Sequence, residues 1–196
     1  MEQKYSILLA EDESLVLLGL KALLTQLGHL VAGEACTGKD AVSLCNSLNP
    51  DLLIMDIKMP VLDGIQALEQ INSTRKFKMP CIFISAYSDD HLIERAKSAG
   101  VFNYLVKPVR LEDLRVALNI TMQQYREYMQ VVQERDQAKA DLKNRKLIER
   151  AKGILMDNFD MKEKQAMEFM QKKARDSHKK LNVIAQGIIQ MDEAIK

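Results

Sequence analysis

The chain has 196 residues, of which 47% are hydrophobic and 28% charged, a composition typical of a soluble globular protein with a buried core. It shows no signal-peptide pattern and no apolar run near the ~20 residues that a membrane span needs, so we expect a cytoplasmic protein without a membrane partner. Residues 1–120 hold 12 Lys and Arg against 15 Asp and Glu, whereas residues 143–196 hold 13 against 8. The basic tail indicates an anionic partner, the alternative being an ordinary solvated surface.

The first part of the chain alternates short apolar runs with amphipathic stretches. The apolar runs predict buried strands at residues 6–10, 30–35, 52–55, 81–85 and 102–106. The amphipathic stretches between them predict helices at residues 15–27, 39–48, 64–72 and 91–99. Strands that alternate with helices at this spacing indicate a doubly wound α/β domain with a parallel sheet over residues 1–120.

A long helix follows, because neither Pro nor Gly occurs between Leu111 and Gly153. A heptad seam can be drawn over residues 111–143, through Leu111, Leu114, Leu118, Thr121, Tyr125, Tyr128, Val132, Arg135, Lys139 and Leu142. An amphipathic helix that extends beyond its domain needs a partner for its apolar stripe. We therefore expect a coiled-coil linker that forms a homodimer, with a monomeric helical spacer as the alternative.

Residues 144–196 show no strand pattern and predict a small all-α domain of three helices, at about 144–157, 162–176 and 181–193. Each predicted helix has an apolar stripe. The stripe residues are Ile148, Ala151 and Leu155, then Ala166, Phe169, Met170 and Ala174, then Leu181, Ile184, Ile188 and Met191. A domain this small is marginally stable alone and should gain from the helix before it.

Polar side chains cluster where the predicted strands end. Glu11 and Asp12 follow the first strand, Asp56 the third and Lys107 the fifth, while Ser85 ends the fourth. In a parallel sheet these ends meet at one edge. Carboxylates gathered there suit Mg²⁺, and Asp56 could attack phosphorus to form an aspartyl-phosphate stabilised by Lys107 and Ser85. Taken alone, an Asp after a strand is more often a helix N-cap.

These residues lie in the segments LLAEDE, LLIMDIKMPVLDG, IFISAY and FNYLVKP. The segments and their spacing resemble bacterial response-regulator receiver domains, which implies a flavodoxin-like fold with five parallel strands. By this resemblance Asp56 is the phosphoacceptor, and Ser85 and Lys107 contact the phosphoryl group. The implied Mg²⁺ ligands are Glu11, Asp12, Asp56 and the backbone carbonyl of Lys58.

The same resemblance has further implications for the switch and the partner. Ser85 and Tyr104 would be the switch residues, the Lys107–Pro108 peptide bond would be cis, and a sensor histidine kinase would donate the phosphoryl group. Glu11 stands where the family more often has Asp. We also expect Tyr87, two positions after Ser85, to shield the phosphoryl group from water.

The tail sequence RKLIERAKGILMDNFDMKEKQAMEFMQKKARDSHKKLNVIAQGIIQ resembles the ANTAR output domain of transcription antiterminators. This resemblance implies a three-helix RNA-binding domain over residues 144–196. Its ligands would be RNA hairpins in nascent leader transcripts, bound by a homodimer that phosphorylation favours. Within the family, the whole-chain pattern resembles the ethanolamine-utilisation antiterminators of Gram-positive bacteria.

Nine residues of the tail are candidates for RNA contact, most of them cations suited to phosphate. They are Arg150, Lys152, Gly153, Lys172, Lys173, Arg175, Ser177, Lys179 and Lys180. A glycine inside a helix costs about 1 kcal/mol relative to alanine. Close helix packing and close approach of an RNA backbone are the two explanations for Gly153. For each lysine, solvated surface is the alternative.

Two other functional classes remain to be weighed. In the first, the helical tail of a receiver docks on a protein instead of RNA. In the second, the chain is an enzyme resembling an aspartyl-phosphate phosphatase, but the sequence offers no substrate pocket signature and no second acid or base. We therefore expect a regulator that catalyses only its own phosphoryl acceptance and hydrolysis.

Overall fold

The computed structural model describes residues 3–86 and 90–195. The chain divides into two compact units, residues 1–129 and residues 130–196. No helix among the described residues is both long and apolar enough to cross a membrane.

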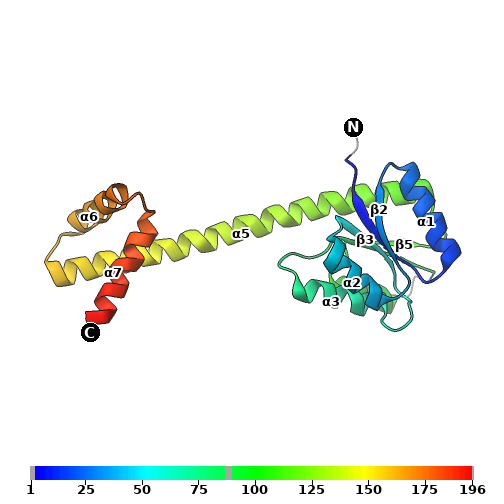
Figure 1. Ribbon diagram of the computed structural model, residues 1–196, viewed down its shortest axis with the longest axis horizontal. Helices are drawn as coiled ribbons and strands as arrows, with labels where there is room; N and C mark the ends of the chain where they lie inside the picture. Colours follow the sequence, from blue (N-terminus) through cyan, green and yellow to red (C-terminus); the bar gives the residue numbers. More distant parts are fainter. Residues whose placement is uncertain (1–2, 87–89, 196) are drawn as a thin grey trace. The chain divides into compact units, whose positions relative to one another are not determined.

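The first unit is built on a sheet of five parallel strands in the order β2-β1-β3-β4-β5. Figure 1 shows this sheet with α1, α2 and α3 beside it. The strands are β1 (Ser6–Ala10), β2 (Leu30–Ala35), β3 (Leu52–Asp56), β4 (Cys81–Ser85) and β5 (Asn103–Val106). The helices between them are α1 (Ser14–Gln26), α2 (Gly38–Leu48), α3 (Gly64–Thr74) and α4 (Asp90–Ala99). The predicted flavodoxin-like fold is confirmed, and every predicted element of this unit begins and ends within two residues of the observed one.

Apolar layers cover both faces of the sheet, because successive side chains of a strand point to opposite faces. Leu8 and Leu53 belong to the layer that contains residues of α2, α3 and α4. Ile7 and Ile54 belong to the layer that contains residues of α1 and of the following helix. Because helices cover both faces of the sheet, a polar site can form only at its edge, and in such folds ligands bind at the carboxyl ends of the strands.

The helix α5 runs without interruption from Leu111 to Phe159. Its first turns do not present the seam predicted for a partner helix. Leu114, Leu118 and Thr121 are at most 1% exposed, and both leucines pack in the same apolar layer as Ile7 and Ile54. The first unit therefore covers this part of the seam, and the prediction that these three residues pair with a second copy is wrong. Pairing through the later seam residues remains a prediction.

The second unit contains the last part of α5 together with α6 (Glu163–Asp176) and α7 (Leu181–Ile195). The first helix predicted for the tail is thus the end of α5 and not a separate element. The core of the unit consists of six buried side chains, Ala151, Leu155, Ala166, Met170, Ala185 and Ile189. Two stripe predictions are wrong, since Phe169 is 40% and Met191 70% exposed.

Candidate phosphoacceptor site and nucleic-acid interface

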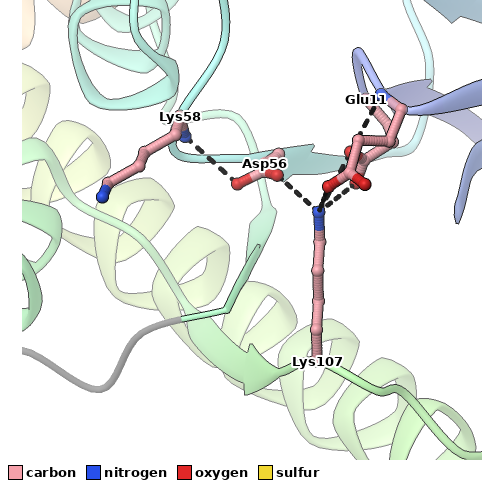
Figure 2. Close-up of polar contacts among 5 residues, drawn as sticks. Glu11, Asp56, Lys58 and Lys107 are labelled. Carbon is pink, nitrogen blue, oxygen red and sulfur yellow. Dashed lines mark hydrogen bonds and ion pairs between the residues drawn. The ribbon is translucent and has the colours of Figure 1, made fainter.

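The acidic site lies at the carboxyl edge of the sheet. Figure 2 shows the Lys107 side chain reaching from beyond β5 toward Asp56, at the end of β3, and Glu11, just after β1. The Lys107 Nζ lies 2.6 Å from Asp56 Oδ2 and 3.0 and 2.9 Å from the two carboxylate oxygens of Glu11. Glu11 and Asp56 are only 1% and 6% exposed. Three strand ends therefore converge on one buried ion-pair cluster.

The charge of this cluster is negative, because carboxylates outnumber the single ammonium group. Ligand oxygens of Glu11, Asp12 and Asp56 lie within 4.8 Å of one another. Burial raises the pKa of Glu11 and the charge of Asp56 adds to that rise, against the lowering effect of Lys107. Burial opposes the charge of Lys107, but its hydrogen bonds to Asp56 and Glu11 raise its pKa. These hard, clustered oxygen donors fit Mg²⁺.

The backbone of Lys58 lies beside the predicted nucleophile. Its N–H donates a hydrogen bond of 3.1 Å to Asp56 Oδ1 (Figure 2). Asp56 therefore has one oxygen held by a backbone amide and the other by the Lys107 ammonium. The part predicted for the Lys58 carbonyl as a metal ligand remains a prediction.

The two predicted switch residues lie on neighbouring strands. Ser85 is 1% exposed at the end of β4, and its carbonyl accepts a hydrogen bond of 2.9 Å from the backbone N–H of Lys107. Tyr104 pairs with Phe83 and packs, half-buried, against the layer that contains α3 and α4 residues. The Lys107–Pro108 peptide bond is cis, as predicted. Tyr87, predicted to act as a shield, lies outside the described residues.

In the second unit, two predicted RNA contacts are engaged with acidic side chains. Lys152 is 12% exposed, and its Nζ lies 2.9 Å from Glu149 and 2.7 Å from Glu163. Arg150 pairs with Glu193 of α7 at 2.7 Å. Both cations therefore bridge α5 to a neighbouring helix in this structure, and phosphate contact would compete with these pairs.

The other predicted cations gather around the end of α6 and the turn that follows. All five are exposed, and none has an acidic partner within the described part of the chain: Lys172, Lys173, Arg175, Lys179 and Lys180. The Ser177 hydroxyl donates a hydrogen bond of 2.6 Å to the Lys173 carbonyl, so Ser177 closes α6. A Cβ added at Gly153 would meet nothing within 4 Å among the described residues. Close helix packing therefore does not explain this glycine.

Comparison with known proteins covers both units. The response regulator receiver domain family matches residues 7–119, and the ANTAR domain family matches residues 136–189. The transcriptional regulatory protein PdtaR of Mycobacterium tuberculosis is 38% identical over 184 residues, which span 94% of this chain and 89% of that protein. The chain belongs to the response regulators. It joins a receiver to an ANTAR domain, the RNA-binding module of transcription antiterminators, and its family is not one of enzymes.

Solved structures resemble the receiver unit of this response regulator. The receiver domain of a modulated diguanylate cyclase from Desulfovibrio desulfuricans is 29% identical, with a TM-score of 0.58 over 63% of this chain and 98% of that one. The CheX-CheY-BeF3-Mg²⁺ complex from Borrelia burgdorferi is 26% identical, with a TM-score of 0.55 over 58% of this chain and 86% of that one. That complex is named for a magnesium ion, consistent with the acidic cluster of this receiver.

Sequence reasoning missed the part played by Gly64, the first residue of α3. Its N–H donates a hydrogen bond of 2.8 Å to the Ile57 carbonyl. A Cβ at this position would lie 2.2 Å from the carbonyl oxygen of Asp56. The start of α3 therefore lies so close to the backbone of the phosphoacceptor Asp56 that a side chain at residue 64 would clash with it. The signal was present as the Asp63–Gly64 pair, but the sequence does not show what approaches it.

We predict that Gly64→Ala displaces the Asp56 peptide and destabilises the receiver by about 1–3 kcal/mol, as overpacking does. The rate of phosphorylation by acetyl phosphate should fall in the same variant. Gly19→Ala is the matched control, because Gly19 lies inside α1 and has nothing within 4 Å of its added Cβ. Thermal unfolding should show the control at or above the wild-type midpoint. Equal midpoints for the two variants would contradict the steric account of Gly64.

Proposed function

We propose that this response regulator is a transcription antiterminator controlled by phosphorylation of Asp56. A sensor histidine kinase supplies the phosphoryl group, and the ANTAR unit binds RNA hairpins in nascent leader transcripts so that a terminator does not form. The observation that carries the proposal is the 2.6 Å contact of Lys107 with Asp56, inside a carboxylate cluster of a chain that also has an ANTAR domain.

The phosphoryl transfer follows from the arrangement of Asp56. A carboxylate oxygen of Asp56 forms a bond to phosphorus while the bond from phosphorus to the donor nitrogen of the kinase histidine breaks. Lys107 is already within contact distance and can follow the charge from the carboxylate to the phosphoryl oxygens. Bound Mg²⁺ would supply charge neutralisation at those oxygens, and Glu11, Asp12 and Asp56 would hold it. Ser85 would donate its hydroxyl to the new phosphoryl group.

We further propose that phosphorylation favours a homodimer, through a surface other than the predicted helical seam. Val106 of β5 and Val116 and Ile120 of α5 are apolar and 44–51% exposed. Val106 and Val116 line the same shallow pocket of about 390 Å³ as the predicted switch residue Tyr104. A change at Tyr104 would therefore alter the surface on which a second copy packs. Burial of these apolar side chains supplies the driving force.

The likeness to ethanolamine-utilisation antiterminators remains a narrower proposal. PdtaR matches both units of this chain, and its name does not carry that function. Identification of the bound transcripts would decide it, since leader RNA of ethanolamine-utilisation genes is then the expected ligand.

The test of RNA binding is retention of a hairpin library with a fixed stem and a randomised loop, measured with and without acetyl phosphate and Mg²⁺. We expect affinity to rise on phosphorylation. The affinity should fall steeply as the salt concentration rises, because binding of Lys and Arg to the phosphates releases counterions from the RNA. A chain that retains no hairpin at low salt in either state would refute the proposal and favour the protein-docking alternative.

A further inference from the structure

One face of α5 in the second unit carries a row of four cations, of which the RNA prediction included only Arg150. Lys139, Lys143, Lys146 and Arg150 are spaced by three or four residues. At 100° per residue they fall within an arc of about 60° and span about 16 Å along the helix. Together with Leu142 and Leu147 they line a shallow groove of about 450 Å³. We call these four residues the cationic ridge.

The cationic ridge is not used to hold the second unit together, apart from its last member. The fully buried core residues of α5 are Ala151 and Leu155, which lie about 110–150° around the helix from the centre of the ridge. Leu147 packs against this core and also lines one side of the groove. Lys139, Lys143 and Lys146 are exposed and have no acidic partner in the ranges that the structure describes. Free ammonium groups aligned on one face suit a ligand with regularly spaced negative charges.

Gly153 extends the cationic ridge by one turn. It follows Arg150 by three residues, and a Cβ added there would meet open space. A glycine within a helix has an energetic cost that no contact within the described part of this unit explains. Absence of a side chain one turn beyond Arg150 lets a polyanion backbone approach the helix closely there.

We infer that an RNA backbone lies along the cationic ridge, with its phosphates on Lys139, Lys143, Lys146 and Arg150 and its closest approach at Gly153. The inference rests on the proposed RNA-binding function and adds Lys139, Lys143 and Lys146 of α5 to the predicted contacts. The ANTAR match begins at residue 136, so it includes the whole ridge.

A second copy of α5 is the competing occupant, because the predicted seam passes through Lys139 and Leu142. Pairing on this face would bring the lysines of both copies close together. Like charges at such spacing destabilise helix contacts. The only strongly exposed apolar side chain in the groove is Leu142, at 57%. Charge complementarity therefore favours RNA.

The decisive experiment compares two triple variants of the full chain that lose the same charge. The test variant is Lys139→Gln, Lys143→Gln and Lys146→Gln, and glutamine preserves helix propensity. The control is Arg145→Gln, Lys162→Gln and Lys164→Gln, all exposed positions outside the ridge. Against the hairpin library, the test variant should lose about 10-fold or more in affinity. Its slope of log K against log salt should become shallower by about 2–3, the share of three phosphate contacts.

The control triple should keep the wild-type slope and lose less affinity than the test triple. Equal losses in both triples would overturn the inference, because net charge alone would then explain them. Unchanged binding by the test triple would also overturn it, while wild-type retention of the library would leave the proposed function standing. A change in sedimentation instead of RNA affinity would identify the ridge as a self-interface, again overturning the inference. Circular dichroism establishes that both triples are folded.

A pair of glycine variants tests the close approach separately. Gly153→Ala should raise the midpoint of thermal unfolding, because alanine is the better helix former, yet weaken hairpin binding. Gly187→Ala is the matched control, as Gly187 lies inside α7 and its added Cβ also meets open space. It should raise the midpoint and leave hairpin binding unchanged. If Gly153→Ala binds hairpins as tightly as Gly187→Ala, the RNA does not approach α5 closely.

Discussion

Asp56→Ala is expected to abolish stable phosphorylation by acetyl phosphate in the presence of Mg²⁺. Asp56 has the carboxylate that Lys107 and the Lys58 amide hold at the sheet edge. Mass spectrometry of the intact chain should show one added phosphoryl group on the wild type and none on the variant. The loss should be complete, because phosphoryl acceptance requires a positioned nucleophile.

Asp12→Ala serves as the control within the same cluster. Asp12 shares the carboxylate cluster but is exposed, and we assign it to the metal and not to phosphorus. The variant should still gain one phosphoryl group, with a requirement for more Mg²⁺. A phosphoryl group of unchanged yield on Asp56→Ala would remove the central assignment. Complete loss in both variants would not separate a lost nucleophile from lost Mg²⁺ binding. Phosphorylation of both variants is therefore measured over a range of Mg²⁺ concentrations, and only the Asp12 variant should recover.

The acidic site could be predicted because each of its residues follows a strand directly. The strand pattern fixed which ends meet, and topology then brought Glu11, Asp56 and Lys107 together. The same reasoning could not find the close approach of Gly64 to the Asp56 carbonyl. That approach depends on where α3 begins relative to the loop that follows Asp56. The spacing of hydrophobic residues in the sequence does not reveal that position.

The fate of the long helix could not be predicted for a different reason. A stripe such as Leu114, Leu118 and Thr121 looks alike whether a sheet or a second helix covers it. The observed cover is the sheet. In the tail, Lys152 looked like a phosphate contact, but Glu149 and Glu163 lie within ion-pair distance of it. Glu163 comes from the next helix, so only the packing shows this pair.

A charge placed in the buried part of the stripe should strongly destabilise the receiver. Leu118→Glu should unfold the receiver, because it places an unpaired charge where the leucine is 1% exposed. The cost of about 3–5 kcal/mol is comparable with the whole stability of many domains. Thermal unfolding and phosphorylation by acetyl phosphate should both be lost or strongly reduced. A folded, phosphorylatable Leu118→Glu would restore the seam as a pairing surface.

Ile120→Glu, two residues further along α5, should behave in the opposite way. Ile120 is 44% exposed, so the receiver should stay folded and accept a phosphoryl group. If the exposed apolar surface with Val116 pairs two copies, the variant should remain monomeric on phosphorylation. Its affinity for an RNA with two linked hairpins should then fall by up to about 10²–10⁴-fold, the usual gain from linked binding. Affinity for one hairpin should hardly change, measured by titration at one salt concentration. Equal losses on both RNAs would place the effect in the RNA-binding unit and end the pairing mechanism.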